Sequence, residues 1–161
     1  MLNPELRIAR RLMDTLTKDV VTAPPREIRA KTFAYALRAV KLYQYLQKKK
    51  DGAGWILGKQ YLRAATSIGA NLAEAQAGES RADFIHKLGI AQKEGRESLF
   101  WLQLLAESQL VGNVILRPLI LETEELVEVI TAILVNSKRR KSDPVRNGVG
   151  FWRFDFRIQN S

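Results

Sequence analysis

A run of small residues in the middle of the chain decides its fold: RAATSIGANLAEAQ, residues 63–76. Apolar residues recur through and before this run at steps of four, four, three and four: Leu57, Tyr61, Ala65, Ile68 and Leu72. This spacing predicts an amphipathic helix over residues 55–77. Gly58 and Gly69 lie inside that helix, although an internal glycine costs about 1 kcal/mol relative to alanine. We therefore expect another helix to approach its backbone closely.

Helical patterns flank this segment on both sides. Helices are predicted over residues 26–50, from Ser80 to the Gly112-Asn113 break, and from a start between Asn113 and Pro118 to about Arg139. The helix that begins at Ser80 alternates steps of four and three, through Phe84, Leu88, Ala91, Gly95, Ser98, Leu102, Leu105 and Gln109. That alternation is typical of a seam in a helical bundle. The sequence therefore predicts an all-α protein.

Within the same helix, residues 99–105 (LFWLQLL) are apolar almost all round. A helix of this kind is buried on more than one side. The run favours a second contact surface, and hence self-association, over a monomer that packs its N-terminal segment there.

Two segments flank the predicted bundle. Asn3-Pro4-Glu5 is a helix-start signal, and Pro24-Pro25 cannot continue a helix. The final residues alternate apolar and charged side chains, which fits either a strand-like docking segment or a flexible tail. We divide the chain into an N-terminal helical arm and hinge (1–25), a helical bundle (26–141) and an irregular C-terminal tail (142–161).

The composition excludes several functional classes. The chain has 161 residues, 46% of them hydrophobic and 27% charged, with no cysteine and one histidine. Disulfides, thiolate zinc sites and multi-histidine metal sites are therefore excluded. No apolar stretch approaches the ~20 residues that span a bilayer. The N-terminus lacks a secretory signal pattern, so we expect no membrane partner and a cytoplasmic location.

Catalytic motifs are incomplete. Asp83 and His86 have the carboxylate-x-x-His spacing of ferritin-like di-iron helices, but that site needs the motif twice and two further carboxylates. The turn at residues 51–54 lacks the Lys-Ser/Thr end of a phosphate-binding loop. We expect no catalytic residues, no metal, no cofactor and no small-molecule substrate, and thus a non-enzymatic protein.

Positive charge is concentrated at the two ends of the chain. The formal net charge is +9, with +8 in residues 1–50, −4 in residues 51–137 and +5 in residues 138–161. Localised basic charge is expected where a protein contacts a polyanion such as RNA or DNA. The alternatives are an acidic protein partner and a solvated surface. The candidate phosphate-binding residues are Arg7, Arg10, Arg11, Lys31, Arg38, Lys41, Lys48, Lys49, Arg139 and Arg140. Bases could stack on Tyr43, Tyr45 or Trp55.

The run at residues 63–76 closely resembles the signature of the four-helix bundle proteins named for intervening sequences in bacterial 23S rRNA. The likeness extends over residues 30–138. It continues in the next helix at Ser80, Asp83, Phe84, Lys87, Ile90, Ala91, Lys93, Glu94, Glu97, Trp101, Leu102, Leu104 and Leu105.

The resemblance implies an antiparallel up-down four-helix bundle that assembles into a homopentameric ring. In one related branch, the accessory variability protein of diversity-generating retroelements, a basic pentamer binds nucleic acid and a reverse transcriptase. Gly69, Asn71 and Trp101 then become bundle or interface residues. The resemblance therefore implies loose binding of RNA or DNA through phosphate contacts, or a scaffold for a partner protein such as a reverse transcriptase.

Overall fold

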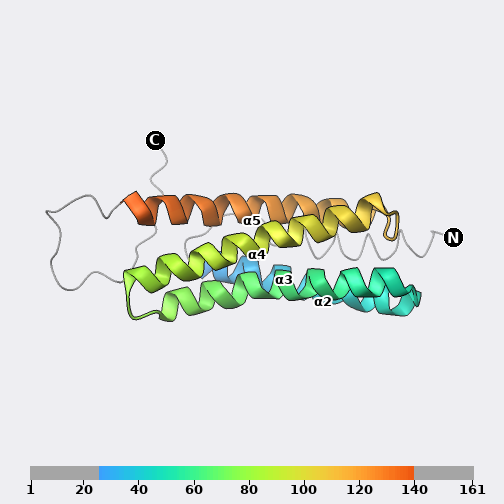
Figure 1. The fold of residues 1–161 in the computed structure, drawn as a ribbon, viewed down its shortest axis with the longest axis horizontal. Coiled ribbons are helices and arrows are strands. Elements are labelled where there is room, and N and C mark those ends of the chain that lie inside the picture. The colour runs from blue at the N-terminus through green and yellow to red at the C-terminus, as the bar shows by residue number, and fades with distance from the viewer. Residues whose placement is uncertain (1–25, 140–161) are drawn as a thin grey trace, which may run out of the picture.

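The computed structural model describes residues 26–139. They form four helices joined by short turns: α2 (Arg26–Lys49), α3 (Gly52–Ala77), α4 (Arg81–Glu107) and α5 (Asn113–Arg139). Consecutive helices run in opposite directions (Figure 1). Because this part of the chain contains no strand, the predicted all-α bundle is confirmed. The predicted arm and tail lie outside the described residues.

The start of α3 was predicted three residues too late. Asp51 precedes the helix, and its Oδ1 accepts hydrogen bonds from the backbone N–H groups of Ala53 at 2.9 Å and Gly54 at 3.3 Å. Capping of these unpaired donors lets the helix include the glycine-rich stretch that the sequence suggested was a turn. Ser80 caps α4 as predicted, with its Oγ 3.1 Å from the backbone nitrogen of Asp83.

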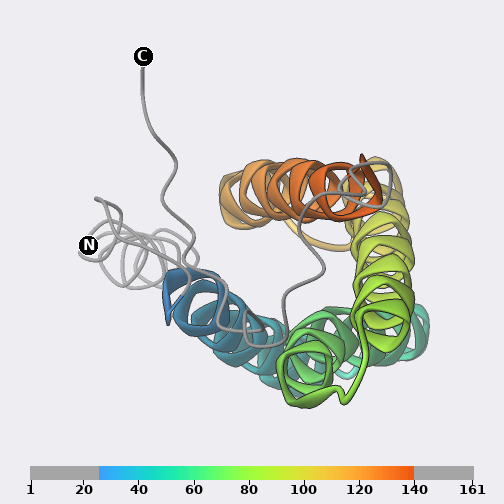
Figure 2. The same cartoon turned by 90° about the vertical axis from the view of Figure 1, so that its left-hand side faces the viewer.

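The four helices follow one another around an arc. In the end-on view of Figure 2, α2 and α5 form the two ends of the arc, and α3 and α4 lie between them. The closest backbone packing is between helices adjacent in the chain. The core is built from the inner faces of all four helices, with Leu42, Ile68, Leu102 and Ile130 among its fully buried members.

Several glycines lie at contacts between adjacent helices. A Cβ added to Gly58 would lie 2.5 Å from Cδ1 of Leu46, and one added to Gly69 would lie 3.6 Å from the Thr32 side chain. Both neighbours are on α2. The close approach expected from the glycines of α3 is found at Gly58, where a Cβ would clash with Leu46, whereas the contact at Gly69 is an ordinary van der Waals distance. Gly95 of α4 faces α5 in the same way, and a Cβ there would lie 2.6 Å from Cγ2 of Val127.

The Gly95 contact leads to a stability prediction. Gly95→Ala gains about 1 kcal/mol of helix propensity, but overpacking costs about 1–3 kcal/mol, and valine has one preferred rotamer in a helix. We expect the variant to lose about 1 kcal/mol of unfolding free energy in urea denaturation. In a Val127→Ala background the same change should be stabilising. An equal effect in both backgrounds would show that the contact does not limit packing.

One polar layer crosses the core. Four of the buried hydroxyl residues, one from each helix, belong to it: Tyr35, Tyr61, Ser98 and Thr123. Tyr35 Oη and Thr123 Oγ1 are 2.6 Å apart, and the two tyrosine rings meet edge to face with centroids 6.4 Å apart. Burial raises the pKa of both tyrosines, so both stay neutral at physiological pH. Tyr61 Oη and Ser98 Oγ make no hydrogen bond within the described residues, so it is the Tyr35–Thr123 bond that favours a single register, between α2 and α5.

Candidate nucleic-acid interface

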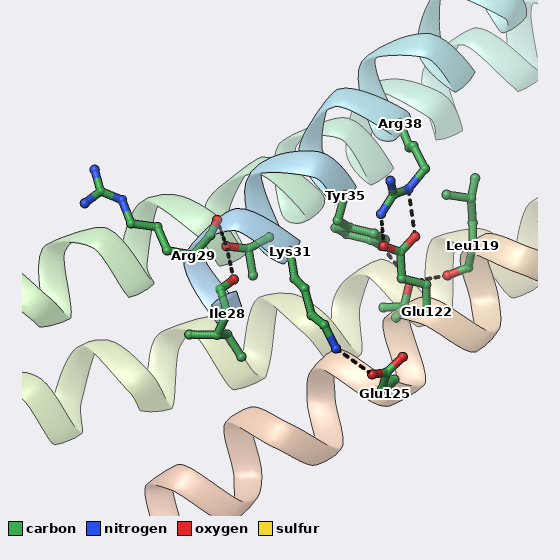
Figure 3. Close-up of polar contacts among 10 residues, drawn as sticks. Ile28, Arg29, Lys31, Tyr35, Arg38, Leu119, Glu122 and Glu125 are labelled. Carbon is green, nitrogen blue, oxygen red and sulfur yellow. Dashed lines mark hydrogen bonds and ion pairs between the residues drawn. The ribbon is translucent and has the colours of Figure 1, made fainter. Parts of the chain in front are cut away.

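Two of the predicted phosphate-binding residues are engaged in ion pairs between α2 and α5 (Figure 3). Arg38 makes a two-pronged contact with Glu122, including Nε to Oε2 at 2.8 Å, and only 11% of the Arg38 side chain is exposed. Lys31 Nζ lies 3.0 Å from Glu125 Oε1. Together with Tyr35 and Thr123, these residues form what we call the α2–α5 seam.

The remaining predicted basic residues are divided between the two ends of the bundle. Lys48 and Lys49 are in the last turn of α2, beside the α2–α3 turn, and Lys41 lies two turns earlier on the same helix; all three are exposed. Arg139 is in the last turn of α5, at the opposite end (Figure 1). Arg7, Arg10, Arg11 and Arg140 lie outside the described residues. The predicted set is therefore not one continuous patch.

A set of cations and aromatic rings flanks the α2–α3 turn. We call it the turn cluster; it comprises Tyr43, Tyr45, Lys48, Lys49, Lys50, Trp55 and Lys59. Trp55 Nε1 donates a hydrogen bond to Tyr43 Oη at 3.0 Å. Lys49 Nζ lies 4.9 Å from the centroid of the Tyr45 ring, and Lys59 Nζ lies 6.0 Å from the centroid of the Trp55 ring. These are cation–π distances, which hold positive charge beside the rings.

A pocket opens within the turn cluster. It has a volume of about 450 Å³ and is lined by Gln47, Lys50, Asp51, Gly52 and Trp55. Trp55 is 42% exposed. Trp55 and the two tyrosines were singled out from the sequence, but two lysines were missed. Lys50 directly follows α2, and Lys59 lies within α3. Their signal was available in the sequence, because both are within five residues of the tryptophan.

The residues predicted to pack the bundle contact mostly their own or the adjacent helix. Gly69 lies against Thr32 of α2. Asn71 Nδ2 donates to the backbone oxygen of Ser67 at 2.9 Å, so this amide bonds within α3 and not across helices. Trp101 is half-buried, and its Nε1 donates to Glu97 Oε1 at 3.2 Å.

Large apolar side chains are exposed on all four described helices, and on α2 and α4 they include a pair one helical turn apart. Phe100 and Leu104 of α4 are 56% and 37% exposed, and we call them the α4 patch. Phe33 and Leu37 of α2 are 67% and 50% exposed, and we call them the α2 patch. The two patches belong to different helices, which are separated by α3 in the arc of Figure 2.

Charged residues on α3 and α4 form a second set of ion pairs. Arg63 pairs with Glu97, and Lys87 pairs with Glu74. The hydrogen bond with Glu74 raises the pKa of Lys87. Burial, reinforced by Glu97, raises the pKa of the half-buried Glu94 carboxyl. Ionisation of Glu94 therefore opposes folding, and this penalty is relieved as the pH falls towards the raised pKa.

Other kinds of site find no support in the described part of the chain. Residues 26–139 contain no group of three or more histidine, cysteine, aspartate or glutamate side chains arranged to hold a metal ion. His86 is exposed on α4. None of the four described helices is both long and apolar enough to cross a membrane.

Comparison with known proteins agrees with this architecture. Residues 26–132 match the family described as 23S rRNA-intervening sequence protein. The fold is also similar to that of a protein of unknown function from the S23 ribosomal protein family of Bacteroides thetaiotaomicron. The two are 36% identical with a TM-score of 0.63, over 66% of this chain and 97% of that chain. No match was found among curated proteins.

Proposed function

Since the chain belongs to the 23S rRNA-intervening sequence protein family, we propose that it is a non-enzymatic, homo-oligomeric bundle that binds RNA or DNA through phosphate contacts. The observation that carries this proposal is the turn cluster. Four lysines, Lys48, Lys49, Lys50 and Lys59, gather there around a single acidic residue, Asp51. Their ammonium groups would displace counterions from a phosphate backbone, which favours binding through release of those ions.

Assembly would bring several turn clusters, each of modest positive charge, into one particle. In the proposed assembly, the α2 patch of one protomer contacts the α4 patch of the next. Because the two patches are different surfaces, this contact is head-to-tail. It closes into a ring when the rotation between protomers permits. A pentamer is the closed form implied by the family resemblance. In such a ring, a single strand that reached several turn clusters would gain about 100-fold or more in avidity.

The proposal is tested by titrating the full chain with a labelled, unstructured 20-nucleotide RNA at several salt concentrations. We expect the logarithm of the affinity to fall linearly with the logarithm of the salt concentration, with a slope near −0.7 per neutralised phosphate. The triple variant Lys48→Glu, Lys49→Glu, Lys50→Glu should bind at least ~10-fold more weakly and show a shallower slope.

A matched control carries the same change in net charge elsewhere. Lys93→Glu, Arg96→Glu, Arg117→Glu alters three exposed residues of α4 and α5, and it should retain most of the affinity. An equal loss in both triple variants would mean that net charge, and not the turn cluster, governs binding. Absence of salt-dependent binding by the unmodified protein would instead favour the alternative proposal of a scaffold for a partner protein.

A further inference from the structure

The indole of Trp55 is an exposed aromatic surface whose orientation is already set. Its Nε1 is tied to Tyr43 Oη at 3.0 Å, while 42% of the residue is exposed. A ring held in this way loses little conformational entropy when another planar group stacks on it. Single exposed apolar side chains are common on protein surfaces, so what favours this indole as a binding surface is its tether together with the pocket and the lysines beside it.

A shallow pocket lies beside this ring. It has a volume of about 450 Å³, is lined by Trp55 with Gln47, Lys50, Asp51 and Gly52, and is open to solvent, so it offers a ligand one face and does not enclose it. A Cβ added to Gly52 would meet nothing within 4 Å, so the backbone on that side of the pocket is open. The Gln47 amide and the Asp51 carboxylate can offer both hydrogen-bond donors and acceptors to a planar polar edge.

Two lysines contribute positive charge near the indole. Lys50 lines the pocket, and the Lys59 ammonium lies over the ring at 6.0 Å from its centroid. Lys50 also has a left-handed backbone conformation, with φ of 54°. Glycine usually fills that position after a helix, because a side chain there is strained. The chain therefore places a cation in the pocket at an energetic cost.

We propose that the pocket binds one unpaired nucleotide, with its base stacked on Trp55 and its phosphates beside Lys50 and Lys59. This inference rests on the proposed nucleic-acid binding and adds that the ligand is single-stranded. Stacked and paired bases of a duplex keep their faces covered by neighbouring bases, whereas an unpaired base presents a free π-face to an aromatic side chain.

The test compares the unmodified protein with Trp55→Ala, using a labelled single-stranded oligouridine and a duplex of equal length. Loss of one stacked base is expected to weaken oligouridine binding by about 5- to 100-fold. It should leave the salt slope unchanged, because no phosphate contact is lost. Duplex affinity should not change, and Trp55→Phe should retain most of the single-strand affinity.

Lys50→Gly provides the complementary variant. It removes the cation and relieves the left-handed strain, so unfolding cannot account for a loss of binding. It should reduce the salt slope by about 0.7, the value for one contact with single-stranded nucleic acid. Trp55→Ala must also retain the native mass in light scattering; a changed mass would assign the indole to a subunit contact and overturn the inference.

The two proposals fail in different ways. If the unmodified protein binds oligouridine with a salt dependence but Trp55→Ala binds equally well, stacking is refuted and electrostatic binding stands. If the unmodified protein prefers the duplex, the single-strand inference is refuted. If it binds neither probe, both proposals are refuted.

Discussion

Replacing Arg38 with methionine is expected to lower the free energy of unfolding by about 3 kcal/mol. The substitution keeps an unbranched side chain but removes the guanidinium that grips both oxygens of Glu122. Only 20% of the Glu122 side chain is exposed, so its carboxylate would be left poorly solvated without its partner. Loss of one member of a buried ion pair costs more than the pair contributes when intact, because an uncompensated charge remains.

Urea denaturation at one fixed protomer concentration measures this effect, since the stability of an oligomer depends on concentration. The double variant Arg38→Met, Glu122→Leu should recover most of the loss, because it leaves no buried charge. Lys31→Met is the matched control in the same seam. Its partner Glu125 is 55% exposed, and exposed pairs contribute only about 0–1 kcal/mol. Equal losses in Arg38→Met and Lys31→Met would contradict the structural role of the Arg38 pair.

Replacing Phe100 with aspartate is expected to reduce the assembly to protomers of 18.3 kDa in light scattering. The side chain is 56% exposed in the protomer, so the substitution does not disturb the core. In a subunit contact it would place a charge in an apolar interface, which is strongly unfavourable. Far-ultraviolet circular dichroism should show unchanged helicity. Val114→Asp, at a residue of α5 that is 60% exposed and outside both patches, should retain the native mass.

Mixing two variants distinguishes a head-to-tail ring from a symmetric dimer. Phe100→Asp keeps the α2 patch intact, and Phe33→Asp keeps the α4 patch intact. In a head-to-tail assembly each variant alone is monomeric, and their mixture forms one contact, which gives twice the protomer mass. A symmetric dimer through the α4 patch would instead survive Phe33→Asp. An unmodified protein of 18.3 kDa would refute the proposed assembly.

The fold could be predicted because its signals are local. Apolar spacing placed the helices, and Ser80 marked the start of α4 correctly. The predicted end at Gly112 was wrong, because α4 ends at Glu107, five residues earlier, and Gln109 has a left-handed backbone conformation in the turn. One glycine of α3 correctly indicated close helix packing. The early start of α3 was missed because it depends on the Asp51 cap, whose side-chain bonds override the turn preference of the glycines that follow.

The candidate site was harder to predict because charge partners are distant in sequence. Arg38 lies 84 residues from Glu122, and Lys31 lies 94 residues from Glu125. The pattern of α2 alone cannot reveal that α5 supplies these carboxylates. Because Arg38 pairs with Glu122, a charge reversal at Arg38 would disrupt the bundle itself and would be a poor test of nucleic-acid binding. Lys41, Lys48 and Lys49 stay predicted phosphate contacts.

The α2–α5 seam also determines how the bundle should open. Contacts between neighbouring helices close short segments of chain, whereas the seam closes a long one, and the entropic cost of closure grows with segment length. The seam depends on polar side chains more than on close backbone packing. We therefore expect separation of α2 from α5 to need less free energy than any other local opening of the bundle. The amide protons of α3 and α4 should resist hydrogen exchange longest.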